Sequence, residues 1–213
     1  MAILYRAQLT PTKMELLSLW APLQPWYASS GPPTLEAIGA YRFDDPDGEV
    51  GIETHLLRST DGQVLQVPLT YRDAALDGAE ASLVGTTEHS VLGKRWVYDA
   101  CGDAVYAQAL ATAILTGGTQ AELEVVTDEG FEVREATTKV AGSGLPGSTV
   151  PHVGTVTVWT EGDDTHISCG GLELTVLRTI NAAARANPPG ASVLVGTWPG
   201  QATPLHLASA RGN

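Results

Sequence analysis

The residue pair with the clearest chemical potential in this sequence is Glu88-His89. A carboxylate beside an imidazole can act as a general base or contribute to a metal site. Neighbouring residues on a strand point to opposite faces, however, so this pair would converge only within a turn. Together with Asp99 the pair forms one hypothesis, a small hydrolase or isomerase, which requires all three side chains to share a pocket.

Other motifs for catalysis or metal binding are absent from the sequence. The five histidines lie in separate segments, and neither HxH nor HExxH occurs. A metal site would therefore have to be assembled by the fold, and we predict no metal and no cofactor. There is no GxSxG motif, and neither Cys101 nor Cys169 lies in a nucleophile motif. The glycine-rich run 142–147 lacks a following lysine and precedes a strand, which disfavours phosphate binding.

Several polar and aromatic residues allow a binding or a structural interpretation. Trp26 and Tyr27 could form a patch for a sugar ring, but packing of a helix onto a sheet is the favoured interpretation. Glu53 and His55 share one strand face by alternation, and we interpret that face as solvated because no second histidine lies at metal-binding spacing. Ion pairs are expected between Lys94-Arg95 and the acidic residues near them. The candidate ligand-binding or partner-binding residues are Trp26, Tyr27, Glu88, His89, Arg95, Trp96 and Asp99.

Composition limits the classes of partner. The formal charge is −12, from 24 acidic residues against 12 lysines and arginines, which disfavours nucleic acid and anionic membranes. No apolar run approaches the roughly 18 residues of a membrane helix, and the N-terminus lacks the apolar region of a signal peptide. We therefore expect a cytoplasmic protein, in which a disulfide between the two cysteines would be uncommon.

The first half of the chain is expected to form an antiparallel sheet with helices. Thr12 and Glu15 form a capping-box pattern at the start of a helix that Pro22 and Pro25 end. A second helix is predicted over 103–116. Alternating apolar and polar residues, separated by acidic turns, predict strands at 35–43, 49–59 and 63–72.

The second half is β-rich. Hairpins are expected from 121–127 with 131–140, and from SVLVGTW with TPLHLAS near the C-terminus. We predict an α+β fold with two regions, 1–118 and 119–213, the latter being either a second small β domain or an extension of the first sheet. An exposed strand edge in either region could pair two copies into a homodimer.

The run from Thr70 to Tyr106, TYRDAALDGAEASLVGTTEHSVLGKRWVYDACGDAVY, with WAPLQPWY at 20–27, resembles the N-terminal cap domain of actinobacterial maltokinases and related aminosugar kinases. The resemblance covers about residues 1–117 and is most specific at 85–99. It implies a cystatin-like unit, a curved antiparallel sheet with the helix 103–116 packed on its concave side, placed ahead of a phosphotransferase core. Such a core needs a catalytic-loop Asp and Asn and a later metal-binding Asp. No HxDxxxxN-like or DFG-like segment occurs in the sequence, so we expect a protein without kinase activity.

Three functions follow as hypotheses. The first is a non-catalytic regulatory or scaffolding protein linked to α-glucan, maltose or trehalose metabolism, whose partner is a kinase or a glucan-metabolising enzyme. The second is a binding module for a sugar or apolar metabolite, with tryptophans in the wall of its cavity. The third is the small hydrolase or isomerase that would use Glu88, His89 and Asp99.

Overall fold

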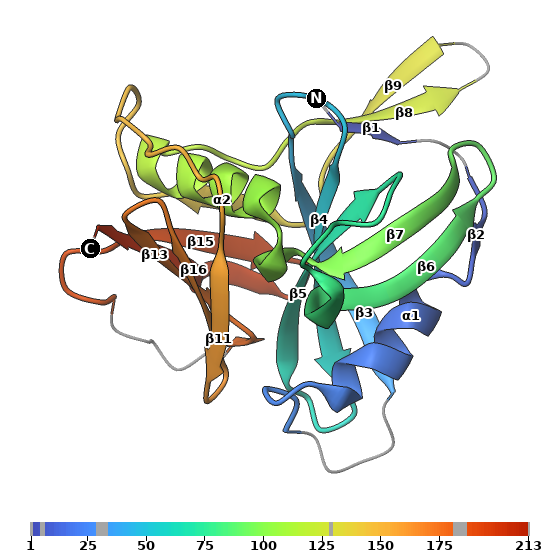
Figure 1. Ribbon diagram of the computed structural model, residues 1–213, viewed down its shortest axis with the longest axis horizontal. Helices are drawn as coiled ribbons and strands as arrows, with labels where there is room; N and C mark the ends of the chain where they lie inside the picture. Colours follow the sequence, from blue (N-terminus) through green and yellow to red (C-terminus); the bar gives the residue numbers. More distant parts are fainter. Residues whose placement is uncertain (1, 5–6, 29–33, 128–129, 181–186, 213) are drawn as a thin grey trace.

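The computed structural model describes residues 2–4, 7–28, 34–127, 130–180 and 187–212 (Figure 1). The strands in these residues form three sheets, and most of them pair antiparallel. The largest sheet has the order β2-β6-β7-β5-β4-β3, with β14 paired to β5, and the second has the order β10-β15-β16-β13-β12-β11. A small sheet joins β1, β8 and β9.

The strands of the largest sheet are β2 (Leu9–Thr10), β3 (Leu35–Phe43), β4 (Gly51–Ser59), β5 (Val64–Arg72), β6 (Leu83–His89), β7 (Gly93–Asp99) and β14 (Thr179–Ile180). Those of the second sheet are β10 (Lys139–Gly142), β11 (Thr157–Glu161), β12 (Asp164–Cys169), β13 (Leu172–Leu177), β15 (Ser192–Trp198) and β16 (Gln201–Gly212). The small sheet contains β1 (Ala2–Leu4), β8 (Leu123–Thr127) and β9 (Gly130–Arg134).

Both predicted helices are present, and local capping explains their bounds. Helix α1 (Lys13–Trp20) begins after Thr12, whose side chain accepts from the Glu15 backbone while the Glu15 carboxylate accepts from the Thr12 backbone. A 3-10 turn containing Pro22, Ala21–Leu23, follows it. Helix α2 (Ala104–Thr116) begins after Asp103, and Gly117 ends it with φ 70°, a conformation that glycine adopts without strain.

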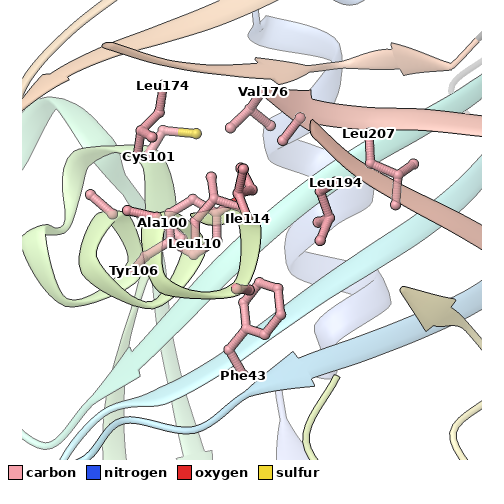
Figure 2. Close-up of a cluster of buried hydrophobic side chains, with 14 of the residues drawn as sticks. Phe43, Ala100, Cys101, Tyr106, Leu110, Ile114, Leu174, Val176, Leu194 and Leu207 are labelled. Atoms are coloured by element: carbon pink, nitrogen blue, oxygen red, sulfur yellow. The ribbon is translucent and has the colours of Figure 1, made fainter. Parts of the chain in front are cut away.

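The position of α2 differs from the expectation. The helix packs chiefly against β10, β12, β15 and β16 of the second sheet rather than on the first sheet alone. Figure 2 shows its residues Tyr106, Leu110 and Ile114 in one cluster with second-sheet residues such as Leu174 and Leu194. Because α2 carries no charged residue and is buried on most of its surface, it needs apolar cover on more than one side.

The two halves of the chain share one core. The larger cluster of buried apolar residues contains Phe43 and Ile52 of the first sheet together with residues of α2 and the second sheet. Gln66, fully buried on β5, donates to the carbonyl oxygens of Leu177 at 3.0 Å and Leu207 at 2.9 Å. The boundary predicted at residue 118 stays a prediction, but the segments on either side of it are bonded and packed together.

The region after α2 departs from the predicted hairpin in one respect. Strands β8 and β9 do pair antiparallel, and the turn residues 128–129 lie outside the described residues. The second strand ends at Arg134 rather than continuing to residue 140, because Lys139–Gly142 pairs with β15 in another sheet. The C-terminal hairpin of β15 and β16 is present as predicted.

Two further expectations concern the cysteines and the membrane. Cys101 and Cys169 are both buried and carry free thiols. Among the described residues, no helix has the length and apolar character needed to cross a membrane.

Candidate functional site

Four polar side chains converge on the first sheet around one carboxylate oxygen, Oε2 of Glu53. Arg42 Nη2 lies 3.2 Å from it, His55 Nε2 lies 3.3 Å from it, and the Lys13 ammonium forms an ion pair with it. The Tyr71 hydroxyl completes the group at 3.4 Å. We call Glu53 and these four residues the Glu53 cluster.

The strand register and helix α1 place the cluster. Arg42 on β3 lies directly opposite Glu53 on β4, and Tyr71 is two positions beyond Leu69, the partner of Glu53 on β5. Such cross-strand and diagonal neighbours lie within reach on one sheet face. Lys13 comes from the first turn of α1, which packs on this same face.

The solvated face expected around Glu53 and His55 is therefore wrong. Glu53 is 8% exposed and His55 is 7% exposed. Leu57, next on the same face of β4, belongs to a core cluster with Leu17 of α1. The helix therefore covers a face that alternation alone would leave to water.

Electrostatics keep Glu53 ionised despite its burial. Burial by itself would raise the pKa of Glu53, but attraction to His55, Arg42 and Lys13 outweighs it and holds this pKa well below its usual value. The pKa of Tyr71 is raised well above its usual value, by burial and by the charge of Glu53. The cluster thus contains a fixed carboxylate and a neutral phenol.

A cleft of about 520 Å³ opens beside the Glu53 cluster. Its walls are the start of α1, the turn between β3 and β4, and the end of the β6–β7 hairpin. The turn is fixed by the Asp45 carboxylate, which accepts from the backbone N–H groups of Asp47, Glu49 and Val50. The charged and polar lining residues are Lys13, Arg42, Asp44, Asp45, Glu49, Tyr71, Thr87, His89 and Arg95.

The hairpin wall of the cleft contains Arg95 and His89. Arg95 Nη2 donates to the Leu92 carbonyl oxygen at 2.7 Å, whereas its Nε is buried without a hydrogen-bond partner among the described residues. His89 Nδ1 accepts from the backbone N–H groups of Val91 at 3.2 Å and Leu92 at 3.0 Å, which places the proton of the neutral ring on Nε2. Burial, Arg95 and Lys13 lower the pKa of His89, so the neutral form prevails at pH 7.

The structure brings two of the candidate site residues, His89 and Arg95, to the cleft, and separates the proposed catalytic three. Glu88 is exposed on the strand beside His89, near the tip of the hairpin. Asp99 ends β7 six residues after Gly93, the partner of His89, which is about 20 Å along a strand. Glu88, His89 and Asp99 therefore do not share a pocket.

Within the described residues, Lys94 and Arg95 form other contacts in place of the expected ion pairs. The Lys94 ammonium lies 4.7 Å from the centre of the Trp96 ring, a cation–π contact. Asp99 instead binds Arg178, at 2.6 and 2.8 Å.

The aromatic candidates near α1 contribute to packing. Trp26 is 2% exposed and lies 5.8 Å from Trp20, ring centre to ring centre, in the core cluster beneath α1. Tyr27 is partly buried at the margin of the same cluster. Packing of a helix onto a sheet, the favoured interpretation of this pair, describes Trp26 well.

Arg178 is a key residue that sequence reasoning missed. It is fully buried between the two sheets, where its Nε donates to Thr165 Oγ1 at 2.8 Å and its guanidinium lies 5.1 Å from the centre of the Trp26 ring. Desolvation would lower the pKa of Arg178, but the charge of Asp99 raises it, so the guanidinium stays charged. The available signal was a lone arginine in the apolar run LELTVLRTI.

Comparison with known proteins adds a family to this geometry. Residues 20–103 match the family described as the maltokinase N-terminal cap domain. No curated protein sequence is significantly similar. A solved structure described as glucosamine kinase in complex with glucosamine, ADP and inorganic phosphate is similar at 17% identity and a TM-score of 0.48, over 96% of this chain and 41% of that one. The chain thus spans less than half the length of that kinase. Through residues 20–103, which contain most of the first sheet, this protein resembles the maltokinase N-terminal cap domain.

Proposed function

We propose that this protein is a non-catalytic regulatory or scaffolding relative of the sugar-kinase cap, acting in α-glucan, maltose or trehalose metabolism by binding a kinase or a glucan-metabolising enzyme. The observation that carries the proposal is the cap match over residues 20–103. Buried acids in this segment also have structural partners, since Glu53 binds Arg42 and Asp103 binds Arg72 at 2.7 and 2.8 Å. Ion pairs of this kind also occur in purely structural networks, which agrees with a role of these acids in the fold.

The most exposed apolar residues of the cap-like hairpin suggest where a partner would bind. Val91 is 56% exposed and Leu92 is 42% exposed, both at the turn between β6 and β7. The substitution Val91→Asp places a charge on this surface. Val133→Asp makes the same change on β9, where the valine is 67% exposed, and serves as the matched control.

The test has two measurements. Purified protein is first assayed for ATP consumption with maltose and with glucosamine, and turnover at an enzyme-like rate would disprove the non-catalytic role. Tagged protein is then used to capture partners from a cell extract, and each captured enzyme is purified and its Kd measured. We expect Val91→Asp to weaken binding about tenfold or more and Val133→Asp to leave it unchanged. Equal effects of both substitutions would contradict binding through the hairpin.

The second candidate function is a binding module for a small metabolite, which the cleft beside the Glu53 cluster favours. Its volume of about 520 Å³ suits a small ligand, and apolar and polar groups both line it. Calorimetric titration with a panel of sugars, sugar phosphates and apolar acids tests this function. Absence of heat across the whole panel would count against it.

A further inference from the structure

We propose that the cleft binds a small anionic metabolite, one that carries a phosphate or carboxylate group, through Lys13, Arg42 and Arg95. This inference rests on the second candidate function, ligand binding in the cleft, and names the class of ligand. It does not depend on a protein partner.

The first argument is the balance of charge at the inner end of the cleft. Lys13 and Arg42 both line the cleft, and both pair with the same oxygen of Glu53. Lys13, Arg42 and Glu53 together thus carry a net charge of +1 beside the cleft. The side chains of Lys13 and Arg42 are 27% and 15% exposed, so water screens that charge only in part.

The second argument is the state of Arg95 on the opposite wall. Within the described part of the chain, the Arg95 guanidinium forms one hydrogen bond, to the Leu92 carbonyl oxygen, and pairs with no carboxylate. A guanidinium has five N–H donors in a planar arrangement that fits carboxylate and phosphate oxygens. An anion in the cleft would supply the acceptors that the described residues do not.

The acidic lining residues of the cleft all belong to the turn between β3 and β4, whereas Lys13 and Arg95 belong to α1 and β7. The Asp45 carboxylate is already bound by three backbone N–H groups of its own turn. Asp44 and Glu49 are exposed on that turn, where solvent and salt screen their charges. A small anion can therefore bind at the inner cations, while the acidic rim and the overall charge of −12 repel large polyanions.

The test is calorimetric titration of the full chain at constant ionic strength. The probes are inorganic phosphate, glucose 6-phosphate, glucuronate and glucose, so that phosphate, carboxylate and neutral sugar are separate measurements. We expect glucose 6-phosphate or glucuronate to bind and glucose to give no heat. In Arg95→Gln the Kd should rise about 10-fold to 100-fold, because a charge-assisted contact is lost.

Arg58→Gln is the matched control. Arg58 is on the same sheet, in an exposed pair with Glu36 at 3.7 Å, and its removal changes the net charge equally. The Kd in this variant should stay unchanged. A direct measurement on the unaltered protein uses the Nε–H signal of Arg95 in nitrogen-correlated NMR, which should shift on titration with the bound anion.

Three outcomes would overturn the proposal. One is absence of binding by every anion up to about 10 mM, which corresponds to negligible affinity. Another is an equal loss in Arg58→Gln, which would indicate a general charge effect. The third is a Kd for glucose as low as that for glucose 6-phosphate. This result would support a ligand site in the cleft and disprove a preference for anions.

Discussion

Substitution of Asp99 by Asn tests the role of the buried Arg178 in holding the two sheets together. The asparagine keeps the shape of the side chain and an oxygen for the Cys101 backbone N–H, which lies 3.2 Å from Asp99 Oδ1. The substitution removes the negative charge of Asp99, which contacts the Arg178 guanidinium at 2.6 and 2.8 Å. Within the described residues, no other carboxylate pairs with this guanidinium. Arg178 is fully buried, so its charge has no water to replace that partner. Loss of one member of a buried pair costs about 3–5 kcal/mol, a large part of the ~5–15 kcal/mol that stabilises a typical domain.

Urea unfolding followed by circular dichroism measures this cost. Glu173→Gln is the control, because Glu173 pairs with Arg211 at 3.4 Å on the surface and its loss should cost under about 1 kcal/mol. Arg178→Met and the double variant Asp99→Asn/Arg178→Met complete a double-mutant cycle. The loss of unfolding free energy in the double variant should be smaller than the sum of the two single losses by about 1–3 kcal/mol. The reasoning fails if Asp99→Asn costs no more than Glu173→Gln, or if the two single costs simply add.

Two other perturbations follow from the same structure. The pKa of Glu53 is lower when folded than its unfolded value of about 4.3, so its charge stabilises the fold above that pH and the contribution is lost as pH falls. Glu53→Gln should therefore destabilise the protein at pH 7 and flatten the decline of the urea midpoint below about pH 4.5; an unchanged acid slope would contradict this. A Cβ at Gly144 would lie 1.9 Å from the Leu115 carbonyl oxygen, so Gly144→Ala should cost about 1–3 kcal/mol in thermal unfolding. Gly154→Ala, where nothing lies within 4 Å, should be nearly neutral, and equal losses would refute the clash.

Elements whose signals are local could be predicted from the sequence. Strand 35–43 and the bounds of α2 were correct because alternation, an Asp cap and a terminal glycine each act within a few residues. The capping box of Thr12 and Glu15 is equally local, since its two hydrogen bonds span three residues. The α+β class followed from these elements.

The parts that could not be predicted depend on contacts between distant segments. Alternation placed Glu53 and His55 on one face correctly, but it could not show that α1 covers this face. The pairing of Asp99 with Arg178 joins residues 79 positions apart, and no spacing rule connects them. The cleft has the same origin, because Arg42, Lys13 and Arg95 come from three separate elements. Sequence reasoning found His89 and Arg95 as candidates from their types alone, without the cavity that unites them.

The ion pairs of the cap-like segment also bear on how far that segment can be considered alone. Asp99 lies within residues 20–103, but Arg178, its partner, lies beyond them. Glu53 lies within the segment, and Lys13, which supplies one of its cations, precedes it. In an isolated segment 20–103, Asp99 would lack its partner Arg178 and Glu53 would lack Lys13. This loss would lower the stability of the segment, and its own apolar contacts would have to offset it. The cap-like sheet therefore depends on α1 for one counter-charge of Glu53 and on the segment beyond residue 103 for the counter-charge of Asp99.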